Sequence, residues 1–148
     1  MGTADFEGFF RSFPGLRSGR FKKNSPPTPG YNCIAWALGR TDRWWWPNEN
    51  SYWPPGCLQR ESIQAFVIAF ATQQYEPCDN PRLEKSYEKL ALYAKDFTPT
   101  HAAKQLKNGK WTSKLGKDMD IEHRLKDLEG PAYGQVLMFF RRRIKDAK

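Results

Sequence analysis

The sequence predicts an α+β fold in which helices come first and a mainly antiparallel sheet follows. Three observations lead to this prediction. Apolar residues recur at helical spacing from residue 62 to 73, an Asn108-Gly109 pair joins two strand-like segments, and residues 135–140 form a continuous apolar run. The 148 residues, of which 39% are hydrophobic, have the length and apolar content of a single domain.

Residues 1–30 are predicted to form an N-terminal arm that contains a short helix. The proline-rich residues 25–30 suit neither a helix nor a central strand, so we expect a turn there and the domain proper over residues 31–148. The helix is indicated by large apolar side chains at spacings of three and four, namely Phe6, Phe9, Phe10, Phe13 and Leu16.

A second short helix is predicted to begin at Cys33. Asn32 is a good N-cap residue, and Gly39 is suited to the left-handed conformation that ends many helices. Cys33 then lies in the first turn, where unpaired N–H groups and the helix dipole favour the thiolate and lower the pKa of the thiol. Cys33 is therefore a candidate nucleophile, although many cysteines serve only as small buried apolar side chains.

An aromatic loop follows over residues 43–56, where prolines interrupt both helical and strand periodicity. Its four tryptophans cannot all be interior, because their ring N–H groups need partners. We expect them to bind substrate together with Asn32, and the alternative is a loop that packs its rings onto the domain. The tryptophans are Trp44, Trp45, Trp46 and Trp53.

The rest of the chain supplies one secure helix and most of the sheet. A helix over residues 62–73 buries Ile63, Phe66, Val67, Phe70 and Ala71 on one face. Strands are expected over residues 89–95, 98–106, 111–115 and 135–140, and a second amphipathic helix over residues 120–128.

Two histidines are available as a base for Cys33. His101 is favoured because a strand beside a hairpin holds its backbone rigidly, whereas His123 falls in the amphipathic helix predicted over residues 120–128. A base within hydrogen-bond reach of the sulfur would accept the thiol proton and later protonate the leaving amine. The third group, which orients the imidazole, is expected to be Ser113, with Asp118, Gln105 and a backbone carbonyl left open.

Other chemistries have less support in the sequence. Three cysteines at irregular spacing argue against a disulfide framework and fit a reducing compartment. A zinc site from Cys57, Cys78, His101 and His123 lacks the close ligand spacing of metal knuckles, and no glycine-rich phosphate loop is present. We therefore expect no metal and no cofactor, and Cys57 is the weaker alternative nucleophile.

Four segments carry a resemblance to known proteins: YNCIAWALG, WWWP, THAAKQLKNGKWTSKLGKDMDIEH and LEGPAYG. They resemble a family of small, functionally uncharacterised bacterial proteins. More distantly, a cysteine at a helix start followed by a strand-borne Thr-His resembles the NlpC/P60 and CHAP branches of papain-like cysteine peptidases and amidases. That resemblance implies a papain-like fold with Cys33 as nucleophile and His101 as base. The sequence departs from those families after the cysteine, where Ile34, Ala35 and Trp36 stand.

The functional expectation is a thiol hydrolase that acts on amide bonds, as an amidase, peptidase or deamidase. Its substrate is expected to be a peptide, a peptidoglycan-like polymer or a protein target, with a cognate inhibitor or immunity protein as a further partner if the protein is an effector. The alternative is a non-catalytic module that binds nucleic acid or a protein, since the net charge of +8 attracts polyanions. No membrane span or signal peptide is evident, so we expect a cytoplasmic protein, or one exported without a cleaved signal.

Overall fold

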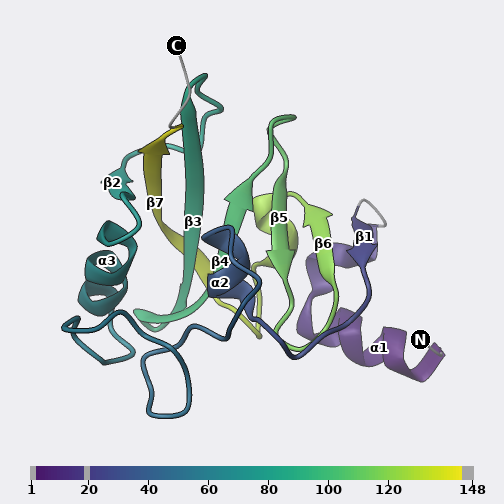
Figure 1. Cartoon of the computed structure of the whole chain (residues 1–148). Coiled ribbons are helices and arrows are strands. Elements are labelled where there is room, and N and C mark those ends of the chain that lie inside the picture. Colours follow the sequence, from purple (N-terminus) through teal and green to yellow (C-terminus); the bar gives the residue numbers. More distant parts are fainter. Residues whose placement is uncertain (1–2, 19–20, 145–148) are drawn as a thin grey trace.

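The computed structural model describes residues 3–18 and 21–144, and its fold is α+β (Figure 1). The described strands form one seven-stranded antiparallel sheet in the order β1-β6-β5-β4-β3-β7-β2. The elements in chain order are α1 (Thr3–Ser12), η1 (Pro14–Ser18), β1 (Lys22–Ser25), α2 (Cys33–Ala37), α3 (Ile63–Ala71), β2 (Glu76–Cys78), β3 (Tyr87–Lys95), β4 (Thr98–Gln105), β5 (Trp111–Lys114), β6 (Asp120–His123), η2 (Leu125–Leu128) and β7 (Gln135–Arg143).

Two apolar clusters cover the two faces of the sheet. Helices α2 and α3 pack on one face, in a first cluster that includes Cys33, Phe66 and Ala102. The N-terminal segment and η2 cover the other face, in a second cluster that includes Leu16 and Tyr93. Because neighbouring residues of a strand point to opposite faces, β4 contributes to both clusters.

The most regular sequence patterns form the elements that they predict. Helix α3 begins after Ser62, whose hydroxyl accepts the N–H of Ala65 at 3.2 Å. Strands β3, β4, β5 and β7 occupy the segments expected for them. The N-terminal helix also forms. The segment that follows it is held to the domain by the buried side chains of Phe13 and Leu16. The side chain of Phe6 is not among those that the structure describes.

The helix predicted over residues 120–128 is wrong. Residues 120–123 form strand β6, which pairs with β5 through Ser113 and Ile121, and only residues 125–128 turn into a 3₁₀ helix. Ile121, Leu125 and Leu128 have helical spacing, yet all three reach the second cluster from a strand and a turn. Strand β1 also lies in the sheet, so four residues before position 31 take part in it.

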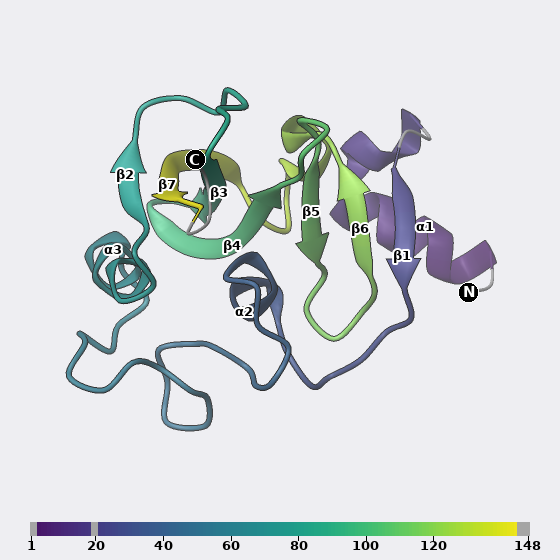
Figure 2. The same cartoon turned by 45° about the horizontal axis from the view of Figure 1, so that its top comes forward.

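Strand β4 joins two parts of the sheet that diverge from each other (Figure 2). It pairs with β3 over most of its length, whereas its pairing with β5 is limited to Lys104 with Thr112 and Gln105 with Trp111. The earlier residues of β4 therefore separate from β5. Helix α2 covers this region and is held to β5 by a hydrogen bond of 3.1 Å from the Trp36 indole to Thr112.

Candidate active site

Cys33 is the first residue of α2, and the buried Asn32 caps that helix. Asn32 Oδ1 accepts the N–H groups of Ala35 at 3.3 Å and Trp45 at 3.0 Å, and its Nδ2 donates to the Trp45 carbonyl at 2.7 Å. One side chain thus fixes both the helix start and the backbone of the aromatic loop. Asn32 lines the pocket, but these bonds engage its oxygen and one donor in anchoring that loop rather than in the expected substrate contact.

Cys33 opens onto a pocket of about 310 Å³. Two of the four tryptophans, Trp44 and Trp46, line it, as expected for a cleft wall. The expectation that Trp45 and Trp53 also bind substrate is corrected, because neither lines the pocket. Trp45 is 1% exposed and Trp53 is 8% exposed, and both lie within the first apolar cluster. The complete lining is Asn32, Cys33, Trp44, Trp46, Thr100, Gly116 and Tyr133.

The Cys33 thiol is protonated at neutral pH. Burial raises its pKa to about 11, and this effect outweighs the N–H groups of Ala102 and Ile34 and the charge of Lys114, which act in the opposite direction. The lower pKa expected from the helix start is therefore wrong. Ionisation of the sulfur requires a group that takes its proton.

His101 belongs to a buried chain of hydrogen bonds across three strands. Its Nε2 lies 2.9 Å from Ser113 Oγ, and the same oxygen lies 2.6 Å from Nε2 of His123. The chain ends at the carbonyl oxygen of Arg124, 2.7 Å from Nδ1 of His123. The other ring nitrogen of His101, Nδ1, is buried and has no hydrogen-bond partner among the described residues.

Both histidines of this chain are neutral at pH 7. Burial lowers the pKa of His101 well below its usual value, and the positive charge that His123 carries once it is protonated lowers it further. Burial likewise lowers the pKa of His123 to about 4, against the raising effects of the Arg124 carbonyl, Asp127 and Glu122. A neutral imidazole with an unpartnered nitrogen can accept a proton, but the lowered pKa makes His101 a weaker base than an exposed histidine.

Tyr133 connects this histidine to the pocket. Its ring stacks on His101, and it also lines the pocket beside Cys33. A tight turn places it there, because Gly130 and Gly134 exchange two backbone hydrogen bonds of 2.9 and 2.8 Å. Thr100 adds a bond of 2.6 Å from its hydroxyl to the Tyr133 carbonyl.

Cys33 and the side chain of His101 lie on opposite faces of the sheet, at neighbouring residues of β4. The backbone N–H of Ala102 acts on the Cys33 sulfur, and both residues belong to the first cluster. The His101 ring instead contacts Tyr93 of the second cluster, with centroids 5.3 Å apart. Among the described residues, no hydrogen bond joins Cys33 to His101.

The separation of β4 from β5 lies beside this pair of residues. Thr100 comes from β4 and Gly116 follows β5, and both line the pocket with Cys33. Pairing between the two strands ends at Lys104 and Thr112, so no ladder closes the sheet between Thr100 and Gly116. His101 lies in this part of β4, where its side chain is fully buried.

Of the four groups considered for the third position, Ser113 is the one bonded to His101. Gln105 instead donates to the Pro81 carbonyl at 2.7 Å, and Asp118 is exposed in the turn between β5 and β6. His123 lies on strand β6, so its contact with Ser113 was hidden by the incorrect helix.

Lys114 and Tyr133 are two site residues that the sequence reasoning missed. Lys114 is fully buried, and its ammonium donates to the carbonyl oxygens of Thr28 and Gly116. Burial lowers the pKa of Lys114, and its positive charge in turn lowers the pKa of Cys33. The pattern of β5 gave a weak signal for this position, since a lysine among inward-facing residues needs a polar environment.

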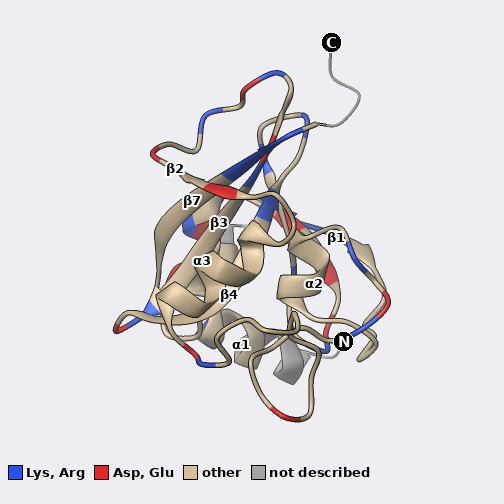
Figure 3. Ribbon diagram, turned by 60° about the vertical axis from the view of Figure 1, so that its left-hand side comes forward, with Lys and Arg blue, Asp and Glu red and all other residues tan. Residues whose placement is uncertain are grey.

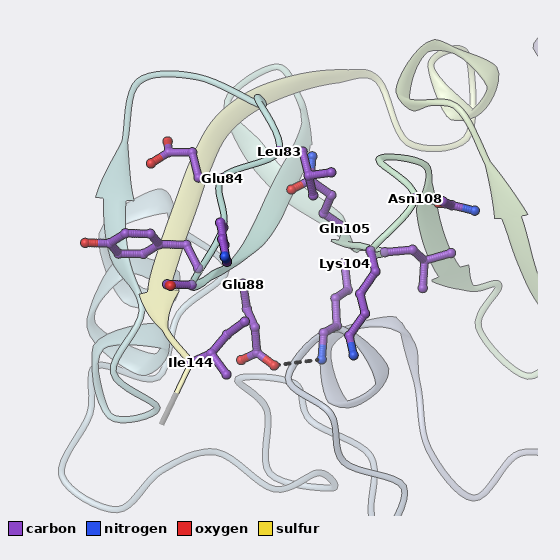
Figure 4. Close-up of a pocket in the computed structure, with 12 residues that line it drawn as sticks. Leu83, Glu84, Glu88, Lys104, Gln105, Asn108 and Ile144 are labelled. Atoms are coloured by element: carbon purple, nitrogen blue, oxygen red, sulfur yellow. Dashed lines mark ion pairs between the residues drawn. The ribbon is translucent and has the colours of Figure 1, made fainter. Parts of the chain in front are cut away.

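A larger groove of about 1040 Å³ lies between the start of β3, the β4–β5 hairpin and the end of β7 (Figure 4). Leu83, Leu106 and Ile144 contribute its apolar surface. None of its lining residues carries a thiol or an imidazole, and within the described chain no group of three His, Cys, Asp or Glu residues is arranged to hold a metal ion. The pocket at Cys33 is therefore the candidate for covalent chemistry.

Comparison with known proteins identifies the family. Residues 22–141 match the model described as a domain of unknown function, DUF7689. The chain belongs to the DUF7689 family. The DUF7689 match includes β1 and all lining residues of the pocket at Cys33. No curated protein and no solved structure matches the chain. Within the described residues of this DUF7689 domain, no helix has the length and apolar character needed to cross a membrane.

Proposed function

We propose that this DUF7689 domain is a cysteine-dependent amide hydrolase, with Cys33 as nucleophile and His101 as general base. The observation that carries the proposal is the buried, unpartnered Nδ1 of His101, next in sequence to the residue whose N–H acts on the Cys33 sulfur. The order of a helix-start cysteine, a strand-borne histidine and a polar partner on the next strand also supports a papain-like scaffold. Peptides and peptidoglycan-like polymers are the proposed substrates.

The reaction begins from neutral partners. As Cys33 attacks the carbonyl carbon of the amide, its Sγ–H proton passes to Nδ1 of His101. The resulting imidazolium gives that proton to the leaving nitrogen, which departs as an amine, and a thioester remains on Cys33. A water molecule, deprotonated by His101, hydrolyses the thioester, so the products are a carboxylic acid and the free thiol.

The proposal requires the Cys33 sulfur and Nδ1 of His101 to approach each other beside the part of β4 that is not paired with β5, by movement of buried side chains. Proton transfer needs a separation of about 3–4 Å between sulfur and nitrogen, and such bonds are often long before substrate is bound. Trp44, Trp46 and Tyr133 line the pocket with Cys33, and we expect these aromatic side chains to exclude water when a substrate fills it.

A bromoacetyl dipeptide tests the proposal, because it presents an electrophilic carbon at the position of a substrate carbonyl. We expect mass spectrometry to locate its adduct on Cys33 at pH 7.5, and we expect His101→Gln to slow adduct formation by about 10²-fold or more. Cys33→Ser is the control for labelling at Cys57 and Cys78. Adducts on those two cysteines with Cys33 unmodified, or equal rates in wild type and H101Q, would overturn it.

A binding module is the second candidate, and the larger groove favours it. Lys85 and Lys107 line the groove and form no ion pair among the described residues, whereas its two carboxylates, Glu84 and Glu88, are neutralised by basic neighbours. Figure 3 shows that the Lys and Arg residues are otherwise distributed over several elements, with Asp and Glu among them. The groove therefore has a net positive rim.

This alternative is tested with a fluorescent single-stranded oligonucleotide and with a poly-glutamate peptide. If the groove binds either polyanion, affinity should fall steeply with salt. The double variant Lys85→Ala/Lys107→Ala should weaken binding about tenfold, whereas Lys110→Ala/Lys117→Ala, at two exposed lysines outside the groove, should have a smaller effect. Equal effects of the two double variants would exclude the groove as the binding site.

A further inference from the structure

Three hydrogen bonds lead from His101 through Ser113 and His123 to the carbonyl oxygen of Arg124. The direction of each bond follows from the chemistry of that carbonyl. A carbonyl oxygen can only accept, so Nδ1 of His123 carries the proton in the bond to Arg124. His123 is neutral at pH 7, which leaves its Nε2 without a proton. The bond of 2.6 Å from that nitrogen to Ser113 therefore uses the serine hydroxyl as donor.

The same reasoning fixes the proton on His101. The Ser113 hydroxyl has one hydrogen, and that hydrogen points to His123. In the bond of 2.9 Å, Ser113 Oγ must then accept, and Nε2 of His101 must donate. The proton of the neutral imidazole is thus on Nε2, and Nδ1 has a free lone pair.

We propose that Ser113 and His123 are positioning residues that hold His101 in the tautomer with a free Nδ1, through a chain anchored on the Arg124 carbonyl. The proposal deepens the proposed function and rests on it for the use made of that nitrogen. It gives a role to His123, which is buried and does not line the pocket at Cys33. It also gives Ser113 a role that alanine cannot perform.

Loss of the anchor has a definite consequence. If residue 123 cannot accept a hydrogen bond, the Ser113 hydroxyl is free to turn and donate to Nε2 of His101. The tautomer of His101 with its proton on Nδ1, which cannot accept the proton of Cys33, then becomes more populated. A side chain with an acceptor oxygen at position 123, such as glutamine, keeps the original direction.

The two histidines make the tautomers directly measurable, because the chain contains only these two. Nitrogen NMR of histidine-labelled protein distinguishes protonated from unprotonated ring nitrogens, and His101→Gln assigns the signals. In wild type at pH 7 we expect opposite tautomers, with Nε2 protonated in His101 and Nδ1 protonated in His123. The same tautomer in both, or a proton on Nδ1 of His101, would overturn the proposal without the need for a variant.

The matched variants are His123→Phe and His123→Gln. The ratio of Nδ1–H to Nε2–H tautomer in His101 should rise at least about fivefold in H123F, as expected for loss of one ordinary hydrogen bond, and should stay near wild type in H123Q. An unchanged ratio in a folded H123F protein would refute the proposal. If H123F does not fold, the wild-type spectrum still decides.

The outcome is separable from that of the proposed function. The tautomers are measured without substrate, whereas the bromoacetyl dipeptide reports on Cys33. Opposite tautomers with an inert Cys33 would support the hydrogen-bond chain and overturn the hydrolase. If Cys33 reacts in a manner that depends on His101 but the tautomers differ from those expected, the hydrolase is supported and the hydrogen-bond chain is overturned.

Discussion

The ring of Tyr133 stacks on the imidazole of His101, with centroids 4.0 Å apart and an angle of 7° between the planes. This contact joins the histidine to the wall of the pocket at Cys33. An aromatic face also attracts a cation, so the same stacking favours the imidazolium that forms when His101 takes a proton. Tyr133 thus has a geometric and an electrostatic effect on the proposed base.

Replacement of Tyr133 should separate these effects from simple packing. We expect Tyr133→Leu to slow the reaction of Cys33 with the bromoacetyl dipeptide by about three- to tenfold, the value of an aromatic pair, while Tyr133→Phe keeps most of the rate. Adduct formation measured by mass spectrometry gives the rates. Equal rates in Y133L and Y133F would show that stacking on His101 has no part in the reactivity.

A second prediction concerns the ionisation of Cys33. Because burial raises the pKa of this thiol to about 11, thiolate should be scarce at pH 7 and should appear only as the pH rises toward 11. The thiolate absorbance of wild type minus that of Cys33→Ser follows this titration, with circular dichroism as a check that the fold persists. A midpoint near the ordinary cysteine value of about 8.5 would mean that sulfur is less buried than in this structure.

The turn that carries Tyr133 depends on glycine at position 134. Gly134 has a φ of 76°, and a Cβ there would collide with the carbonyl oxygen of Ala94. Gly109 in the β4–β5 hairpin has a similar φ of 87° with open space around it, which makes it a matched control. Gly134→Ala should therefore reduce the free energy of unfolding by at least ~1 kcal/mol more than Gly109→Ala, as measured with urea. Equal losses would show that the collision is relieved by movement of the turn.

Asn32 provides a test of how the pocket wall is anchored. Asn32→Ala removes the helix cap and both bonds to Trp45, so we expect a loss of about 2 kcal/mol in unfolding free energy and increased exposure of Trp45 to a fluorescence quencher. Asn32→Asp keeps an oxygen for the Ala35 and Trp45 N–H groups but loses the donor to the Trp45 carbonyl. Because the second carboxylate oxygen would face the Trp45 carbonyl in a buried site, we expect N32D to lose about as much stability as N32A. A much smaller loss in N32D would show that the bond to the Trp45 carbonyl contributes little.

The sequence supplied the individual parts of the site more readily than their arrangement. The cap at Asn32 and the hairpin at Asn108-Gly109 are local signals, which is why Cys33 begins a helix and β5 returns beside β4. The bond between Ser113 and His101 then depends on how the two strands separate. The helix predicted over residues 120–128 was wrong because three apolar residues at helical spacing also fit a short strand followed by a tight turn.

The remaining features of the site depend on contacts between distant segments. Tyr133 reaches His101 from a turn more than thirty residues later in the chain, and Lys114 finds its acceptor at Thr28. Trp45 is buried in the first cluster, and two bonds between its backbone and the side chain of Asn32 anchor this part of the loop. No periodicity in the sequence encodes such pairings.

The buried histidines predict a fall in stability at acid pH. Burial lowers the pKa of His123 to about 4 in the folded protein, whereas an unfolded histidine titrates near 6.5, so between these values the unfolded chain binds more protons. The stabilisation is complete above pH 6.5 and is lost as the pH falls toward 4, by about 3 kcal/mol for His123. His101 acts in the same direction.

Urea unfolding at pH 7 and pH 5 measures this effect. Wild type should lose stability between the two values, and His123→Gln should lose less, because glutamine does not titrate and retains an acceptor for Ser113. Lys117→Ala, at an exposed position away from the histidines, should show the wild-type difference. If H123Q loses as much as wild type, His123 is not buried as a neutral imidazole, and the direction assigned to the hydrogen bonds of Ser113 fails with it.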